Sequence, residues 1–394
     1  MGRVMGVVLA LAPPALLGCA TSTSSTDAGT SSPGLESGVE EAAAADGGEA
    51  EAAAKDGGND AALAADGSGI DDGGEAGVVD GASDGGRDPT LQPFSSTGVW
   101  NLPIGSGAQW GATSDPDVAQ LEGTSAMILA ADYGKPFYVG TATDPLITLE
   151  TTDKMYPVPT QKLHVPSSAS FKLWMDMFDR TQPRYFWSSY NCSFLDDAGV
   201  TGGVTCSYTA VADVCGDGVV NEFGAGRYDW GVGTIRHWEL EAGAIQHTLR
   251  YAVSVDVAKS AGPVWNQGVA WPDDNEDYDG PTAYKGELLF GSTIAIPASE
   301  DIAKLGLSSG GLVLARALQD HGAIMRDTTG DTNRLAFYAE PQDEDNPVLK
   351  QMRGDLPKIT KVLRVMRNQS STSVNGGGTP RAGLVPPIDK SVCP

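Results

Sequence analysis

The chain has 394 residues, of which 51 are acidic and 26 are Lys or Arg, so its formal net charge is −25 at pH 7. No basic patch interrupts this acidity, and a negative surface is repelled by the phosphates of nucleic acid. Composition therefore excludes nucleic acid as an expected partner.

The first 18 residues have the pattern of a signal peptide for export. Arg3 is their only charged residue, and an apolar run from Val4 to Leu17 follows it. This run is too short, and too interrupted by proline, to span a bilayer as a helix. Its ending, Leu16-Leu17-Gly18-Cys19, resembles the lipobox of bacterial lipoproteins, which implies cleavage before Cys19 and lipidation of that cysteine. An ordinary signal peptide with a chance cysteine is the alternative.

Lipidation at Cys19 implies a protein tethered to a membrane and not spanning it, since several acyl chains together give stable anchoring. We therefore expect an outer-membrane or cell-surface location. Residues 19–90 are predicted to be a disordered linker rich in Ala, Gly and Ser. Residues 20–90 hold 16 acidic residues, two basic residues and no aromatic residue. Such a segment cannot bury enough apolar surface to offset its ordering entropy.

Residues 91–394 are predicted to form one mostly β globular domain. Pro and Gly recur roughly every ten to fifteen residues, and short runs alternate in polarity, which is typical of a sandwich or barrel. We expect an antiparallel, jelly-roll-like β-sandwich with one or two short helices. The expected strands lie near residues 125–131, 147–150, 245–255, 288–296, 323–327 and 334–339.

The clearest predicted hairpin spans Phe171–Tyr190. Met175 and Met177 share its apolar face, Trp174 lies on the other face, and residues 179–183 form the turn.

One helix is predicted between an N-cap at Ser308 or Ser309 and a C-terminal Gly322. Its apolar stripe should include Leu314 and His321. Arg316 and Asp320 are spaced for a surface ion pair. A shorter helical turn is expected near residues 299–305.

The domain contains four cysteines: Cys192, Cys206, Cys215 and Cys393. Four cysteines in an exported domain predict two disulfides, for which three pairings are possible. A Cys192–Cys206 bond would close a local loop and leave Cys215 to join Cys393. We prefer this pairing.

The segment Arg236–Arg250 resembles the best-preserved stretch of a group of secreted, β-rich bacterial proteins of uncharacterised function. In that group an acidic turn and a glycine lead into a strand that carries a histidine and an arginine. Other matching pieces follow the same chain order: Tyr185-Phe186-Trp187, Trp271-Pro272, Leu314–Gly322 and Asp327. The chain departs from the group at Tyr185, where an acid is usual, and at His321, where tyrosine is usual. The resemblance supports a β-rich fold and implies no reaction.

Glu239, His247 and Arg250 form the most promising catalytic cluster. A carboxylate and an imidazole can act as general acid and base, and an arginine can neutralise a sugar carboxylate or an oxyanion. His247 and Arg250 should point to opposite faces of a strand, so one of them is expected to be a structural partner. A buried network that stabilises a sheet is the alternative to an active site.

Three acidic residues, Asp273, Asp274 and Asp277, follow the Trp271-Pro272 pair in an acidic loop. Hard oxygen ligands on a loop suit Ca²⁺, which is the one cofactor that the sequence suggests. A solvated acidic loop is the alternative.

Trp174, Trp187 and Trp271 are the candidate substrate-binding residues, because the flat face of a tryptophan stacks well on a sugar ring. For Trp174, packing at a sheet edge is the alternative.

These features together predict a cell-surface lipoprotein whose β-sandwich domain acts on an extracellular polysaccharide, as a lyase or a glycosidase. A non-catalytic glycan-binding or cell-surface interaction module is the alternative. An enzyme needs its ionisable cluster to line a cleft. A binding module keeps that cluster buried and satisfied, and presents an open aromatic face.

Overall fold

The computed structural model describes residues 86–131, 133–152, 158–169, 174–194, 202–219, 231–263, 268–274, 276, 280–330 and 332–394. The predicted signal peptide, Cys19 and most of the predicted linker lie outside these residues, as does Asp277. The last linker residues belong to the folded domain, since Thr90 is buried and Arg87 forms a β-bridge with Ile388. In the described part of the chain, every helix is too short or too polar to cross a bilayer.

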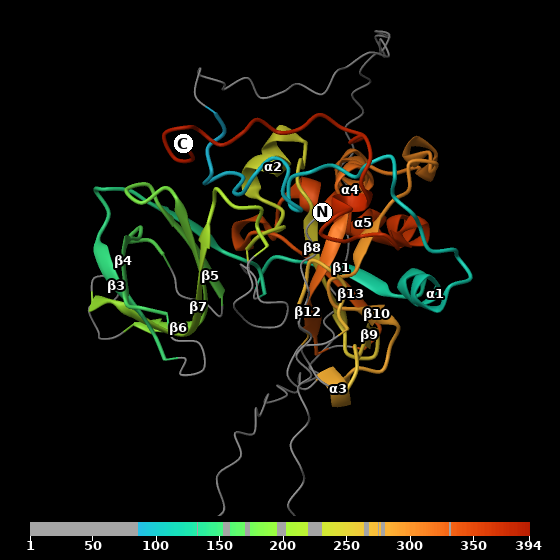
Figure 1. Cartoon of the computed structure of the whole chain (residues 1–394), viewed down its shortest axis with the longest axis horizontal. Helices are drawn as coiled ribbons and strands as arrows, with labels where there is room; N and C mark the ends of the chain where they lie inside the picture. The colour runs from blue at the N-terminus through green and yellow to red at the C-terminus, as the bar shows by residue number, and fades with distance from the viewer. Residues whose placement is uncertain are drawn as a thin grey trace, which may run out of the picture. The chain divides into compact units, whose positions relative to one another are not determined.

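Within the described residues, the strands form two six-stranded sheets and one two-stranded sheet (Figure 1). We name each six-stranded sheet by the apolar core that it borders: the larger sheet lies on the larger core, and the smaller sheet lies on the smaller one. The larger sheet has the order β1 (Ser125–Leu129), β13 (Arg334–Tyr338), β8 (Leu249–Ser254), β12 (Ala323–Thr329), β11 (Thr293–Ala295) and β14 (Arg364–Val365). The smaller sheet has the order β2 (Phe137–Gly140), β5 (Trp174–Asp179), β6 (Tyr185–Phe194), β7 (Val204–Asp213), β3 (Leu146–Thr151) and β4 (Gln161–His164). The short sheet pairs β9 (Ala258–Lys259) with β10 (Leu288–Leu289).

The strand-rich fold is confirmed, and strands lie near all the expected positions, except that the one expected near 288–296 is two short strands, β10 and β11, in different sheets. Both large sheets are mixed. Strand β8 runs parallel to β12 and antiparallel to β13, while β3 runs parallel to β7. The expectation of purely antiparallel sheets is therefore wrong, and a jelly roll is not confirmed. Polarity patterns report which residues are buried, and they carry no information about the direction of the neighbouring strand.

The described residues contain more helices than the one or two expected: α1 (Pro116–Glu122), α2 (His237–Ala242), α3 (Gly280–Ala283), α4 (Ser309–Asp320), α5 (Pro347–Ile359) and the 3₁₀ turns η2 (Ile302–Leu305), η3 (Pro341–Asp343), η4 (Thr360–Val362) and η5 (Val374–Gly376). Helix α4 follows its prediction. The Ser308 side chain accepts a hydrogen bond from the backbone N–H of Gly311 at 3.1 Å, and Gly322 has a left-handed φ of 74°. The predicted pairing of Asp320 with Arg316 is wrong, because Asp320 pairs with Arg381 at 3.3 Å.

Helices α4 and α5 cover one face of the larger sheet. Alternate residues of its central strands, such as Tyr251 and Phe337, lie in the core beneath these helices. The opposite face of the sheet carries Arg250 and Ala252, and there Ile324 packs with Phe178 of the smaller sheet. The two large sheets thus face each other across a mixed apolar and polar layer.

The predicted hairpin is confirmed as the antiparallel pair β5 and β6, with Met177 opposite Trp187. Met175, Met177 and Trp187 are buried in the core of the smaller sheet. Asp176 and Phe178 alternate with these residues, so they face the larger sheet. This alternation places a carboxylate between the two sheets.

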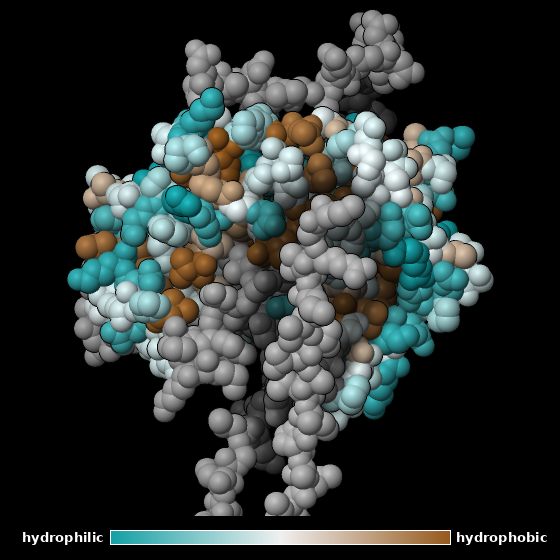
Figure 2. All heavy atoms as spheres, in the orientation of Figure 1, coloured by the Kyte–Doolittle hydropathy of each residue, from teal (hydrophilic) through white to brown (hydrophobic). Residues whose placement is uncertain are grey.

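Both disulfides have the preferred pairing. The Cys192–Cys206 bond joins the neighbouring strands β6 and β7, and the Cys215–Cys393 bond closes a separation of 178 residues. On the face seen in Figure 2, apolar residues occur in several small groups separated by polar ones.

Candidate functional site

Glu239 and His247 are brought together by the short helix α2. Glu239 lies in the first turn and accepts a hydrogen bond from the backbone N–H of Arg236 at 2.9 Å. Gly243, with a φ of 65°, ends the helix and reverses the chain. The reversal returns His247 to the helix, where its Nε2 lies 3.0 Å from Oε1 of Glu239.

Both ring nitrogens of His247 are occupied. Nδ1 lies 2.9 Å from the carbonyl oxygen of Thr248, which can only accept a hydrogen bond, so Nδ1 donates. Nε2 faces the Glu239 carboxylate. Burial alone would lower the pKa of His247, but the charge of Glu239 and these hydrogen bonds raise it above its ordinary value. A ring whose two nitrogens are both engaged has no free nitrogen to accept a proton from a substrate, and this geometry favours the structural alternative for the pair.

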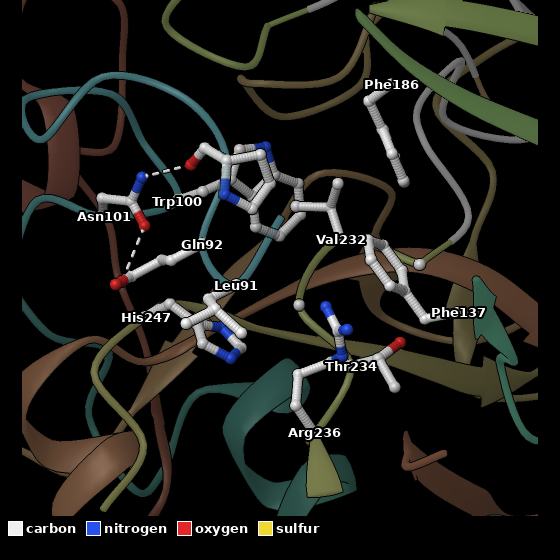
Figure 3. Close-up of a pocket in the computed structure, with 13 residues that line it drawn as sticks. Leu91, Gln92, Trp100, Asn101, Phe137, Phe186, Val232, Thr234, Arg236 and His247 are labelled. Carbon is white, nitrogen blue, oxygen red and sulfur yellow. Dashed lines mark hydrogen bonds between the residues drawn. The ribbon is translucent and has the colours of Figure 1, made fainter. Parts of the chain in front are cut away.

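The pocket beside this pair is small (Figure 3). It leaves about 30 Å³ of free space, enough for a water molecule or two. The Arg236 guanidinium lies 3.6 Å from the centre of the Phe137 ring and pairs with Glu340 at 3.1 Å. Trp100 forms another wall and His247 lies at the edge. This space cannot hold a sugar ring, so the predicted histidine does not line a substrate cleft.

Arg250 belongs to a different set of residues, which we call the inter-sheet cluster: Lys135, Asp176, Ser188, Arg250, Asp327 and Tyr338. Arg250 Nη2 lies 3.7 Å from Asp327 Oδ2, and the Tyr338 hydroxyl donates to the same oxygen at 3.4 Å. A bulge between Met325 and Asp327 in strand β12 sets the position of this aspartate. Arg250 therefore does not join Glu239 and His247 as predicted, because it leaves strand β8 on the other face.

Asp176 is the buried acid of the inter-sheet cluster. Its side chain has no solvent exposure, and Ser188 Oγ donates a short hydrogen bond to Oδ1. Oδ2 has no hydrogen-bond partner among the described residues. The backbone of Gly231 lies against this carboxylate and leaves no room for a Cβ atom. Burial raises the pKa of Asp176 to about 6, although Ser188 and the nearby cations oppose the shift.

Two cations complete the inter-sheet cluster. The Lys135 Nζ lies 4.7 Å from the centre of the Tyr338 ring, and the Arg250 guanidinium lies 5.0 Å from it. Burial, together with the charge of Arg250, lowers the pKa of Lys135 well below its ordinary value, while Asp327 and Asp176 oppose this shift. A carboxyl group and an amine with pKa values shifted toward neutrality thus lie in one cluster, which is the environment of acid–base sites.

Strands β6 and β7 carry an aromatic pair next to the inter-sheet cluster. The rings of Tyr190 and Tyr208 stack with their centres 6.0 Å apart, and Tyr208 is 42% exposed. Burial, Asp327 and Tyr208 raise the pKa of Tyr190. The Asp327 side chain is itself 16% exposed, so the inter-sheet cluster reaches solvent at this residue.

Of the three predicted stacking tryptophans, Trp187 contradicts the prediction. Trp187 is 1% exposed within the core of the smaller sheet, so its assignment as a stacking residue is wrong. Trp271 is half-buried against the apolar layer between the sheets. The side chain of Trp174 lies outside the described residues, although its backbone begins β5.

The predicted calcium ligands have other partners or are not described. Asp273 is buried in an ion pair with Arg326, which supplies the charge that a metal ion would bring. Asp274 lies beside it, and Asp277 is outside the described residues. The described part of the chain contains no group of three acidic, histidine or cysteine side chains placed to hold a metal ion.

The structure thus defines a strand-rich domain, closed by two disulfides, with an ionisable cluster buried between its sheets. No protein-family model, curated protein or solved structure matches the chain.

Proposed function

We propose that the protein is a cell-surface lipoprotein whose folded domain hydrolyses glycosidic bonds of an extracellular polysaccharide, with the inter-sheet cluster as its catalytic centre. The observation that carries this proposal is the environment of the Asp176 carboxyl group. Its carboxyl group is fully buried, one oxygen has no partner among the described residues, and its pKa is about 6. A domain that needed only stability would gain little from a carboxyl group held in this way.

The inter-sheet cluster contains the parts that glycoside hydrolysis requires. Asp176 would donate a proton to the leaving oxygen, because its pKa lies near neutrality. Asp327 would serve as the second carboxylate, held by Arg250 and Tyr338. Gly231 covers Asp176, so the proposal requires the segment from Gly231 to Thr234 to move when the substrate binds. The two facing sheets would then form the sandwich that contains the substrate.

The location rests on the N-terminal pattern alone. A signal-like apolar run ending at Cys19, followed by an acidic linker, supports export and a lipid anchor. Extracellular polysaccharide is the abundant polymer that an anchored domain of this kind meets.

The proposal is tested with the purified full chain in detergent against a panel of neutral and anionic polysaccharides. Reducing ends and the ultraviolet absorbance of unsaturated products are both measured. We expect new reducing ends without unsaturated products, and a loss of at least about a hundredfold in Asp176→Asn. Asp213→Asn, which removes an exposed carboxylate from the same sheet, should keep the wild-type rate. Unsaturated products would indicate a lyase, and an unchanged rate in Asp176→Asn would refute the assigned centre.

A glycan-binding module without catalysis is the second candidate. It is favoured by the complete pairing of Glu239 with His247, and by the backbone that covers Asp176. Binding of a polysaccharide with no cleavage of any panel member would establish this alternative.

A further inference from the structure

A second opening, larger than the pocket beside His247, is a groove of about 340 Å³. Its walls are residues 243–246, the C-terminal half of α4 and residues 382–386. Figure 1 shows the C-terminal segment passing α2 and α4. The volume is within the range of ligand pockets and about ten times that beside His247.

Arg316 supplies a charged group to this groove. It is exposed, and its guanidinium has no hydrogen bond or ion pair within the described residues. Asp320, one helical turn further on, also lines the groove, but its carboxylate is paired with Arg381. The Asp320 carboxylate also attracts Arg316, but one carboxylate near two guanidinium groups leaves this region with a net positive charge.

His321 supplies a buried polar group. It is 3% exposed, it lines the groove, and its Nδ1 has no hydrogen-bond partner among the described residues. Burial and the nearby His247 lower the pKa of His321 to about 3, so the ring is neutral at physiological pH. A buried ring nitrogen without a partner is costly, and a ligand hydroxyl would satisfy it.

Much of the remaining wall of the groove is apolar, and it includes the buried Ile245 and Val385 and the more exposed Val313 and Leu384. Leu384 is 50% exposed. A sugar ring has one face of C–H groups that packs on such a wall, while its hydroxyl groups need polar partners at the edge.

The C-terminal wall is fixed in place without a ligand. The Arg87 N–H donates to the Pro387 carbonyl oxygen at 2.8 Å, and the Asp389 N–H donates to the Arg87 carbonyl oxygen at 3.2 Å. The disulfide from Cys393 to Cys215 follows a few residues later. These hydrogen bonds and the disulfide hold the wall in place before a ligand binds, which reduces the entropy lost on binding.

We propose that this groove binds a uronic acid unit of a polysaccharide, with Arg316 holding the carboxylate and His321 bonding a ring hydroxyl. The planar guanidinium matches a carboxylate in bidentate fashion, and the apolar wall takes the ring face. The choice of a saccharide rests on the proposed function, whereas the requirement for an anionic ring rests on the groove itself.

Binding is measured by titration calorimetry with uronic acid trisaccharides: glucuronate, galacturonate, mannuronate and guluronate types, each beside its methyl ester. The purified full chain should bind at least one acid, and its ester should bind at least about tenfold more weakly. Arg316→Gln should weaken binding of the acid by a similar factor. Arg184→Gln removes an exposed arginine from the turn before β6 and should leave binding unchanged.

Three results would overturn the inference: no binding of any acid, equal binding of acid and ester, or equal binding by Arg316→Gln and wild type. Because Arg316 is exposed, its variant should fold, and a thermal melt verifies this. Binding that depends on Arg316 without any polysaccharide cleavage would support this groove while rejecting the proposed hydrolase.

Discussion

Glu239 and His247 form a buried pair whose contribution to stability depends on pH. The pKa of His247 is raised in the folded state. The stabilisation is therefore fully present below the unfolded pKa of about 6.5 and is lost as pH rises through the folded pKa. Glu239→Gln should lower the free energy of unfolding by about 1–3 kcal/mol at pH 6, and by less at higher pH.

Chemical denaturation at several pH values measures this difference. Glu241→Gln is the matched control, because Glu241 lies on the same helix in an exposed pair with His237 and should contribute less than about 0.5 kcal/mol. If Glu239→Gln melted at the wild-type temperature and lost polysaccharide cleavage, the result would contradict the structural role and support a catalytic role for this pair.

Removing the charge of Asp176 should raise the stability of the domain, whereas removing that of Glu239 should lower it. Its pKa of about 6 lies above the unfolded value of about 3.9, so the folded state binds the proton more strongly. Stability associated with this group is fully present below about pH 4 and is lost as pH rises toward 6. Asp176→Asn should therefore have a free energy of unfolding higher than that of wild type at pH 7, by up to about 3 kcal/mol. At pH 4 the two proteins should have the same free energy of unfolding. A variant less stable than wild type at pH 7 would show that Asp176 is a structural anion.

At the level of elements, the contact between α4 and α5 depends on Gly311. Asp355 of α5 accepts hydrogen bonds from the backbone N–H and the hydroxyl of Ser308, at 2.7 and 2.6 Å. A Cβ atom on Gly311 would overlap the Asp355 carboxylate. Gly311→Ala should therefore displace this cap and lower stability by about 1–3 kcal/mol, despite the better helix propensity of alanine.

Gly354, inside α5, is the control for that substitution. A Cβ atom there meets no other atom within 4 Å. Gly354→Ala should raise the free energy of unfolding by about 0.5–1 kcal/mol. Equal effects of the two substitutions in denaturant melts would contradict the close packing of the helices.

Helix α5 was not predicted, although the sequence carries local signals for it. Asn346 caps the helix by accepting from the Val348 N–H at 2.9 Å, and Leu349, Met352 and Leu356 are buried at helical spacing. Gly354 and Pro357 interrupt that pattern, and they argue against a helix in local terms. Packing on α4 and the larger sheet stabilises it regardless.

At the scale of the whole molecule, the Cys215–Cys393 disulfide holds the C-terminal segment over a separation of 178 residues. Cys192–Cys206 spans only 14. Because loop entropy grows with loop length, removing both cysteines of the long bond should cost about 5 kcal/mol, against about 3 kcal/mol for the short one. Denaturation of the two double serine variants measures this order, and the reverse order would indicate that the C-terminus is loosely held.

The membrane anchor is predicted to be covalent lipid on Cys19. Cys19→Ser should release the protein from the membrane fraction and leave the melting temperature of the domain unchanged, because lipid and not packing retains it. Fractionation after a carbonate wash measures the release. A variant that stays in the membrane fraction would contradict the lipoprotein proposal.

Local signals in the sequence were sufficient for the elements that depend on local physics. Alternating polarity predicted the hairpin of β5 and β6, a cap and an apolar stripe predicted α4, and cysteine spacing in a chain predicted to be exported led to the preferred disulfides. Each of these depends on residues close in sequence or on a small number of possible pairings.

Only the tertiary structure decided which ionisable groups meet. In the sequence, Asp176 reads as the solvent face of a hairpin strand, and nothing local reveals that a second sheet covers it. Arg250 is three residues from His247, yet the strand directs it to Asp327 and Tyr338, which come from distant segments. Burial between two sheets is set by strand direction and sheet contact, and these arise from long-range packing that a periodic pattern does not record.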